Sequence, residues 1–323
     1  MLIRKICILG GSGFVGRTLA NRLTKDGYQL RVLTRDREAN RGNLILLPTL
    51  ELVQADVRDR SVLESQFAGC DAVINLVGIL NERGRSGAGF RMAHVELARN
   101  VVGACRASGV HRLLHMSALN ADAINGPSHY LRTKGEAEDL VHRADDIRAT
   151  SLRPSVIFGR GDDFFNRFAR LLKAMPWVFP LACASARFAP VFVGDIAEAF
   201  ARTMIDPGAY GKRFNLCGPR IYTLRELVTY TARCINVRRH VIGLPDALSR
   251  LQAAVFDFVP GKPFSTDNYL STKVDSVCTC NDLDTLGIAP TPLEAVVPSY
   301  LSGSDARASY QNFRSHSRRN AGF

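Results

Sequence analysis

The sequence lacks the long apolar segments and the cysteine motifs that mark several large protein classes. No run of about 18 apolar residues occurs, so we expect no transmembrane helix. The eight cysteines are scattered, and Cys278 and Cys280, separated by one residue, fit neither a zinc knuckle nor a redox Cys-x-x-Cys motif. We therefore predict no metal site, reduced cysteines and a cytoplasmic location.

Internal repeats and low-complexity linkers are also missing, which favours a second half that packs onto the first. An apolar stretch follows Arg4 and Lys5, but glycines at positions 10, 11, 13 and 16 interrupt it and argue against a signal peptide. The formal net charge is +12, yet no recognisable nucleic-acid motif accompanies it. We therefore expect no nucleic-acid partner.

The C-terminal segment is the one place where basic residues stand without acids. Residues 302–323 contain no acid after Asp305 and carry Arg307, Arg314, Arg318 and Arg319. We expect this segment to be a disordered, solvated tail, with contact to an anionic surface as the alternative.

Strand-like and helical patterns alternate through the first half of the chain. Strands are predicted at residues 2–9, 29–34, 52–55, 72–77 and 113–117, with the clearest helices at 14–26, 90–107 and 130–143. Two further strands are predicted at 150–158 and 190–193. This alternation predicts an α/β fold of the Rossmann type, with a doubly wound parallel sheet covered on both faces.

A glycine-rich loop joins the first predicted strand to the first helix. Gly11, Gly13 and Gly16 fit the pattern G-x-G-x-x-G, and Gly10, Gly13 and Gly16 fit G-x-x-G-x-x-G. In such loops the turn is tight and the backbone approaches a pyrophosphate closely. The helix that follows presents free N–H groups to the phosphates. We therefore predict dinucleotide contacts at Gly10, Gly13, Phe14, Val15, Gly16 and Arg17.

The end of the second strand predicts which dinucleotide binds. Arg35 stands where a guanidinium holds the 2′-phosphate of NADP(H), and Arg17 offers a second contact. Asp36 argues for NAD(H), because its spacing also suits the acid that binds a free ribose hydroxyl. We favour NADP(H) and keep NAD(H) as the alternative.

Three polar residues form a candidate catalytic group. Ser117 ends the fifth predicted strand, and Tyr130 and Lys134 lie one turn apart on one face of the next helix. A nearby ammonium favours the phenolate form of a tyrosine. We therefore predict that Tyr130 exchanges a proton with a substrate oxygen, that Lys134 adjusts its pKa and holds the nicotinamide ribose, and that Ser117 holds the substrate oxygen. Tyr130 and Lys134 are thus predicted to contact the cofactor as well.

The glycine loop followed by this group resembles the short-chain dehydrogenase/reductase superfamily. Further matches to its extended and atypical branch are Asp56-Val57, Arg153-Pro154 before Phe158-Gly159, and the sequence VFVGD at 191–195. The resemblance implies cofactor contacts at Asp56, Val57, Arg153 and Pro154, and we add Val77 at the end of the fourth strand.

Within that branch, the chain resembles proteins related to the 39-kDa accessory subunit of respiratory complex I. The matching stretches are residues 10–17, NLVGIL at 75–80, YLRTKGEAE at 130–138, LRPSVIFGRGD at 152–162, PFSTDNY at 263–269 and TPLEAVV at 291–297. This implies a bound NADPH and work beside quinone or respiratory membranes, without implying a known reaction.

The resemblance also implies a domain division. A dinucleotide-binding domain is expected at 1–158 together with 190–217, and a small C-terminal substrate-covering lobe at 159–189 and 218–301. His94 stands where extended members usually carry an asparagine that supports a proton relay to the lysine. It either replaces that asparagine or is a packed residue, and we favour the second.

Two stretches of the expected lobe carry apolar stripes at helical spacing. They are Phe164, Phe168, Leu171, Leu172 and Met175, and then Leu244, Leu248, Leu251 and Val255. Such stripes either form core, line a hydrophobic substrate pocket or lie on a membrane.

Three functions remain open. We favour an NADP(H)-dependent oxidoreductase acting on a hydrophobic alcohol, ketone or quinone-related substrate. A non-catalytic NADPH-binding accessory protein of complex I or quinone metabolism is the alternative, and a sugar-nucleotide epimerase or dehydratase is a weaker one. Expected partners are the dinucleotide, a hydrophobic small molecule, and a respiratory complex or the anionic inner face of a membrane.

Overall fold

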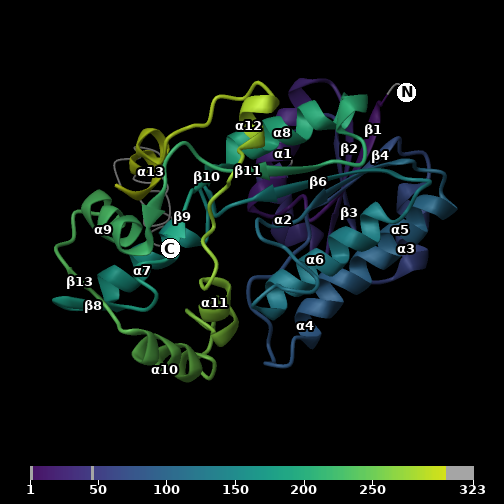
Figure 1. Cartoon of the computed structure of the whole chain (residues 1–323). Helices are drawn as coiled ribbons and strands as arrows, with labels where there is room; N and C mark the ends of the chain where they lie inside the picture. Colours follow the sequence, from purple (N-terminus) through teal and green to yellow (C-terminus); the bar gives the residue numbers. More distant parts are fainter. Residues whose placement is uncertain (1–2, 45–46, 303–323) are drawn as a thin grey trace, which may run out of the picture.

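A computed structural model describes residues 3–44 and 47–302 of the chain. A seven-stranded parallel sheet organises it, with the strand order β11-β6-β5-β4-β1-β2-β3 (Figure 1). The strands are β1 (Lys5–Leu9), β2 (Gln29–Thr34), β3 (Leu50–Gln54), β4 (Ala72–Asn75), β5 (Arg112–Met116), β6 (Arg148–Pro154) and β11 (Arg213–Leu216). The expected basic tail lies outside the described residues.

Period-two alternation in β1 shows why both faces of the sheet are covered. Ile6 and Ile8 face one hydrophobic cluster, whereas Cys7 and Leu9 face the other. Helices α1 (Phe14–Lys25) and α8 (Val193–Ile205) pack together over the first cluster, and α3 (Arg60–Phe67), α5 (Leu97–Ala107) and α6 (His129–His142) cover the second. The predicted doubly wound α/β fold is therefore confirmed.

The remaining helices of this part lie near the edges of the sheet. Helix α2 (Arg37–Leu44) contacts β3, and α12 (Asp282–Thr285) contacts β11. The helix predicted at 90–107 is less regular than expected. It consists of α4 (Ala88–Arg91), a π-helical turn at Met92–Glu96 and α5.

A smaller lobe, teal to yellow in Figure 1, lies beside the sheet. Its helices are α7 (Phe164–Ala174), α9 (Leu224–Cys234), α10 (Asp246–Phe256), α11 (Thr266–Ser271) and α13 (Leu293–Leu301). Three strand pairs complete it: β7 (Ile157–Phe158) with β10 (Val191–Phe192), β9 (Arg187–Phe188) with β12 (Tyr222–Thr223), and β8 (Val178–Leu181) with β13 (His240–Gly243).

The two apolar stripes of the lobe differ in burial. The stripe on α7 packs into the core of the lobe, where Phe168 and Leu172 meet Phe179 and Val228. On α10, by contrast, the side chains of Leu248, Leu251 and Val255 are exposed. The core interpretation therefore holds for α7 and is wrong for the outer face of α10.

The prediction of reduced cysteines is wrong at one pair. Cys217, just after β11, forms a disulfide with Cys278, 61 residues later. The other six cysteines are free. Spacing along the chain gave no sign of this pair, because the fold brings together two segments that are remote in sequence. In the part of the chain that the structure describes, no helix is long and apolar enough to span a membrane.

Candidate cofactor-binding and active site

The glycine loop is shaped by two different steric requirements. Gly10 has a positive φ of 75°, and a Cβ on Gly16 would lie 2.4 Å from the Cα of Gly11, so neither position tolerates a side chain without rearrangement. Gly13 has an extended backbone (φ −74°, ψ −178°), and a Cβ there would meet only the Gly10 oxygen within 4 Å, at 3.2 Å. The loop thus offers an open, backbone-lined cradle at Gly13, which fits a pyrophosphate at the N-terminus of α1.

The side chains of Phe14, Val15 and Arg17 contact different parts of the chain. Val15 packs against the first hydrophobic cluster, and the Phe14 ring lies 3.4 Å from where a Cβ of Gly159 would stand. The Arg17 guanidinium lies 3.4 Å from the corresponding position at Gly161. Arg17 therefore lies against the turn after β7, and no contact joins it to Arg35 within the described chain.

Two charged residues follow β2: an exposed arginine, and an aspartate whose carboxylate already accepts a hydrogen bond. Arg35 is exposed, and its guanidinium makes no hydrogen bond or ion pair with the described residues. The Asp36 carboxylate accepts a hydrogen bond from the Ala39 N–H at 2.9 Å, while the Asn40 amide binds the Asp36 carbonyl at 2.7 Å. Asp36 thus caps the first turn of α2. Arg35 is then the charged side chain at this strand end that is available to bind a phosphate.

Asp56, a predicted cofactor contact, forms an ion pair with the nearby Arg58. Asp56 accepts hydrogen bonds from the Arg58 side chain, at 2.9 and 2.7 Å, and from the Arg58 backbone at 3.0 Å. These bonds lower the pKa of Asp56 to about 2. Val57 packs against the second hydrophobic cluster.

The loop after β4 closes the other side of the cradle. A Cβ on Gly10 would lie 3.3 Å from the Val77 nitrogen, so Val77 stands beside the glycine loop. The Asn75 side chain accepts a hydrogen bond from that same Val77 N–H at 3.1 Å. Asn75 thus shapes the loop, and a buried asparagine in an apolar strand was the only sequence signal for it.

Lys134 lies buried directly behind this loop. Its ammonium donates to the Met116 carbonyl at 3.0 Å and lies 3.0 Å from where a Cβ of Gly78 would stand. Burial lowers the pKa of Lys134 to about 8, against the opposing pull of Glu138. The lysine therefore stays mostly protonated at neutral pH.

Tyr130 lies one turn before Lys134 on the same face of α6. Its half-buried ring packs edge-on against Phe90 and His94, with centroids 6.1 and 5.6 Å apart. Burial, and then the charge of Asp267, raise the pKa of Tyr130 to about 12. In this state the tyrosine is a neutral phenol that can donate a proton, and its predicted proton exchange with a substrate oxygen beside Lys134 stays a prediction.

Ser117 faces Glu138, one turn beyond Lys134 on α6. The buried Ser117 hydroxyl lies beside Glu138, whose pKa it helps to lower, and makes no well-aligned hydrogen bond with the described residues. Because this hydroxyl is buried, it is closed to a substrate oxygen in this arrangement, and its predicted contact with substrate stays a prediction.

Arg153 also points to Glu138 rather than outward. Its guanidinium binds the buried Glu138 carboxylate at 2.9 and 2.6 Å, and Arg213 binds the same carboxylate. Burial raises the pKa of Glu138, but these arginines outweigh it and hold that pKa below its usual value. Arg153 thus serves a buried ion-pair cluster, and Pro154, at the end of β6, stays a predicted cofactor contact.

His94 stands in the π-helical turn with both ring nitrogens engaged. Nε2 accepts the Ile79 N–H at 3.3 Å, so the ring proton is on Nδ1, which lies 2.9 Å from the Thr133 hydroxyl. Burial and the charge of Lys134 lower its pKa to about 2, so the ring stays neutral. These contacts support the packed alternative and connect the β4 loop to α6.

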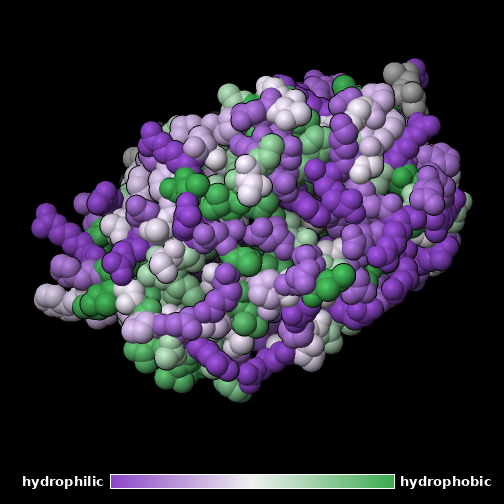
Figure 2. Space-filling model, viewed as in Figure 1, coloured by the Kyte–Doolittle hydropathy of each residue, from purple (hydrophilic) through white to green (hydrophobic). Residues whose placement is uncertain are grey.

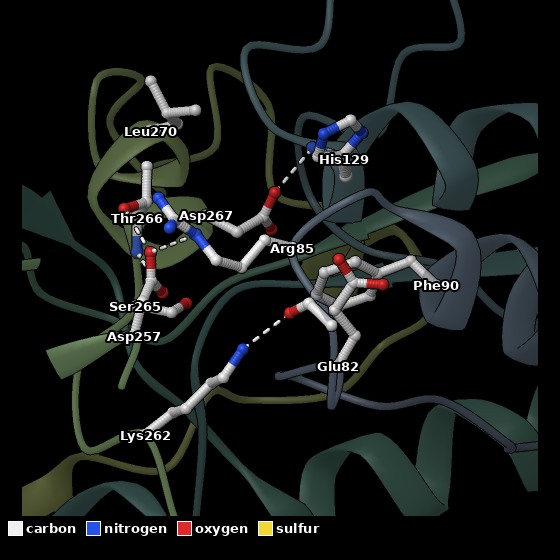
Figure 3. A pocket seen from close by; sticks show the side chains of 11 residues that line it. Glu82, Arg85, Phe90, His129, Asp257, Lys262, Ser265, Thr266, Asp267 and Leu270 are labelled. Carbon is white, nitrogen blue, oxygen red and sulfur yellow. Dashed lines mark hydrogen bonds and ion pairs between the residues drawn. The ribbon is translucent and has the colours of Figure 1, made fainter. Parts of the chain in front are cut away.

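A small cavity adjoins the start of α6 on the side of the lobe. It holds about 120 Å³ and is lined mainly by charged and polar groups, among them Glu82, Arg85, Lys262 and Asp267 (Figure 3). Arg85 pairs with Asp257, and Lys262 donates to the Gly84 carbonyl. No local sequence pattern indicates this cavity, because its residues meet only when the lobe folds back onto the sheet.

Comparison with known proteins is consistent with this geometry. The sequence model of the NAD dependent epimerase/dehydratase family matches residues 6–217. The chain is 31% identical over 297 residues to mitochondrial NADH dehydrogenase [ubiquinone] 1 alpha subcomplex subunit 9 of Mus musculus, covering 89% of this chain and 77% of that protein.

Two further proteins share its sequence or its fold. A ceramide reductase of Caulobacter vibrioides is 30% identical over 244 residues, covering 75% of this chain and 74% of the relative. The solved structure of the Escherichia coli NADPH-dependent quinone oxidoreductase QOR2 with NADPH has a TM-score of 0.71 at 21% identity, covering 90% of this chain and 98% of that one. The second likeness shows the fold alone.

Proposed function

Because this chain belongs to the NAD dependent epimerase/dehydratase family, we propose that it is an NADP(H)-dependent reductase acting on a carbonyl of a hydrophobic substrate. The observation that carries the proposal is the placement of Tyr130 and Lys134. They share one face of α6, and Lys134 lies against the β4 loop that closes the glycine cradle.

The cofactor preference rests on the end of β2. Asp36 caps α2, so the acid that would bind a free ribose 2′-hydroxyl is already engaged. The exposed guanidinium of Arg35 suits the 2′-phosphate of NADP(H), which it can bind through two parallel hydrogen bonds. The open backbone at Gly13 takes the pyrophosphate.

The chemistry divides between the cofactor and two side chains. NADPH, when bound in the glycine cradle, would supply the hydride that reduces a carbonyl carbon. Tyr130, held protonated by burial, donates its phenolic proton to the carbonyl oxygen as negative charge develops there. Lys134, positively charged and one helical turn away, stabilises the phenolate that remains. In this structure no hydroxyl from Ser117 assists at that oxygen.

The substrate class is supported by a relative and by the cavity. The Caulobacter vibrioides relative is a reductase of ceramide, a lipid. The cavity at His129, the residue before Tyr130, is lined by several charged groups, which suits the polar end of such a molecule. We therefore propose a lipid-like ketone with a polar head, and keep quinone-related carbonyls within the same class.

The test combines cofactor and substrate measurements on the purified full chain. Nucleotide that copurifies is identified by mass spectrometry, and the affinities for NADPH and NADH are compared by calorimetry. A panel of long-chain ketones is then assayed by NADPH consumption. Tighter binding of NADPH and turnover of at least one ketone support the proposal, whereas tight nucleotide binding with no turnover rejects its catalytic half.

A second function is favoured by the placement of Ser117. With the Ser117 hydroxyl buried, the site suits nucleotide binding better than catalysis, which fits an NADPH-holding accessory protein of a respiratory complex. The Mus musculus relative is named as a subunit of NADH dehydrogenase [ubiquinone]. Epimerase chemistry on sugar nucleotides, to which the family name refers, stays a weaker candidate.

The cellular location also stays a proposal. We keep the cytoplasmic side of a membrane as the proposed location, although one of its grounds, a fully reduced set of cysteines, is weakened by the disulfide between Cys217 and Cys278. Fractionation of cells that express the tagged full chain tests it directly.

A further inference from the structure

The outer end of the small lobe exposes large apolar side chains. Hydrophobic residues gather over α10 and over the β8–β13 pair, at the lower left of Figure 2. Trp177 is 81% exposed, Phe258 76% and Leu251 58%. The other exposed members are Val178, Ile242, Leu248, Val255 and Val259. A concentration of this kind on one end of a molecule marks an interaction surface.

Helix α10 turns three large apolar side chains toward the solvent. Leu248, Leu251 and Val255 follow one another at spacings of three and four residues, so they form one outward stripe. Inward, the helix buries only the small residues Ser249 and Ala253. Folding therefore leaves this stripe without an intramolecular partner.

The exposed strand face continues the same surface. In β8, Phe179 and Leu181 turn inward to the lobe core, which leaves Val178 facing out. Ile242 of the paired strand β13 is likewise exposed. Gln252 of α10 binds the Pro180 carbonyl at 3.4 Å, so helix and strands form one continuous face.

A basic hollow adjoins this apolar face. It holds about 510 Å³ and is lined by residues 229, 232, 233 and 236–240, among which no carboxylate occurs. Arg239 is held by the carbonyls of Leu172 and Met175. Arg233 and Arg238 have no side-chain partner among the described residues. The His240 N–H binds the Trp177 carbonyl at 3.0 Å, so the hollow meets the apolar face at Trp177.

We propose that this end of the lobe is a docking surface for anionic membranes, with Trp177 and the α10 stripe in the interface and lipid phosphates in the basic hollow. Tryptophan prefers the boundary between headgroups and acyl chains, and arginines beside an apolar face are attracted to anionic lipids. A second copy of the chain is a poorer occupant, because a two-fold contact would bring the two basic hollows toward each other.

The experiment uses the full-length protein and its own fluorescence. Trp177 is the only tryptophan in the sequence, so its emission reports on this surface alone. Vesicles of equal parts phosphatidylglycerol and phosphatidylcholine are compared with vesicles of phosphatidylcholine alone, by emission shift and by flotation. We expect a blue shift and flotation with the anionic vesicles only, both weakened by high salt.

Two variants and two matched controls separate this surface from the rest of the chain. Arg233→Glu with Arg238→Glu removes the charge of the hollow, and Leu251→Ser with Phe258→Ser removes apolar contact. Loss of each arginine lowers the partition coefficient roughly fivefold, and reversal lowers it further. Lys25→Glu and Ile205→Ser, exposed on the other part of the molecule, leave binding unchanged.

Three outcomes overturn the proposal. The first is no flotation of the wild type at low salt. The second is flotation with an unshifted Trp177 emission, or with unchanged binding by both lobe variants, because the protein then uses another surface. The third is a concentration-dependent dimer that Leu251→Ser with Phe258→Ser dissolves, since the face would then be covered by a second copy. None of these outcomes depends on the reductase proposal.

Discussion

The carboxylate of Asp267, on the small lobe, accepts a hydrogen bond from the backbone N–H of Tyr130 at 3.2 Å across 137 residues of sequence. It also accepts the His129 N–H at 2.7 Å, while Ser128 accepts that of Leu131. The lobe thus supplies a negative charge at the N-terminus of α6, where the helix dipole favours it. Lobe position and the environment of Tyr130 are therefore coupled.

Replacing Asp267 with asparagine should lower the pKa of Tyr130, because the present charge raises it. A proton donor loses function as pH rises through its pKa, so the alkaline limb of the pH–rate profile should move to lower pH. Loss of the charged cap should also cost about 1 kcal/mol of stability. Asp284→Asn, exposed on α12, is the control. An unmoved alkaline limb with an intact fold would falsify the coupling.

Tyr130→Phe should reduce turnover by about 10²–10⁴-fold, the usual contribution of general acid catalysis, while NADPH affinity stays near wild type. Lys134→Met should also weaken NADPH binding, because its ammonium faces the β4 loop beside the cradle. Steady-state kinetics and calorimetry give the two readouts. If Tyr130→Phe complements a deletion strain fully while a cofactor-loop variant does not, the accessory function replaces the catalytic one.

Arg35→Ala should weaken NADPH binding about tenfold or more, since a charge-assisted hydrogen bond contributes roughly 1.5–3 kcal/mol. NADH binding should hardly change. Arg17→Ala serves as the comparison: its guanidinium faces Gly161, so it should not affect the ratio of the two affinities. Calorimetry measures the affinities of the wild type and both variants for NADPH and NADH. Equal affinities of the wild type for the two nucleotides would remove the basis for the proposed NADP(H) preference.

Gly13→Val should abolish nucleotide binding and leave the fold nearly intact, because the backbone there is extended and a Cβ meets only the Gly10 oxygen. Gly16→Val should instead prevent folding, since its Cβ would overlap the Gly11 backbone. Circular dichroism and thermal unfolding show whether each variant is folded, and calorimetry shows whether Gly13→Val still binds nucleotide. Native nucleotide affinity in a folded Gly13→Val variant would refute the loop assignment.

Glu138→Gln should destabilise the protein by about 3 kcal/mol or more, because it leaves Arg153 and Arg213 without their shared carboxylate. Ser117→Ala should leave turnover within a few-fold of wild type, since its hydroxyl lies beside Glu138 and makes no well-aligned bond with the described residues. Denaturant unfolding measures the stability of Glu138→Gln, and steady-state kinetics measure the turnover of Ser117→Ala. A hundredfold loss of turnover in Ser117→Ala would show that the serine reaches the substrate after all.

Local patterns predicted the fold and the cradle well. The glycine loop and α1 are specified by neighbouring residues, and the β1 and β2 strands are short apolar runs, so the sequence alone predicted them with nearly correct bounds. The Tyr130–Lys134 face also follows from helix periodicity, which needs no tertiary information.

Long-range contacts explain what the sequence did not show. Ser117 was placed correctly at a strand end, but its orientation depends on Glu138 and Arg153, which lie on other elements. Asp267 and the Cys217–Cys278 pair belong to segments that approach only in the folded chain. Asp36 is ambiguous for a local reason, since a carboxylate at that spacing can either bind a ribose hydroxyl or cap the following helix.

The π-helical turn around His94 has a consequence for deletions in this helix. A π turn holds one more residue than the α-helix on either side of it. Removing a single residue from Met92–Glu96 would let the helix run on as a regular α-helix with the segments on either side nearly in their present register, because the turn already absorbs one extra residue. A residue deleted from α5 would instead rotate the preceding helix by about 100° and take Phe90 away from the Tyr130 ring, so the π turn is where this helix can change length without moving the wall of the active site.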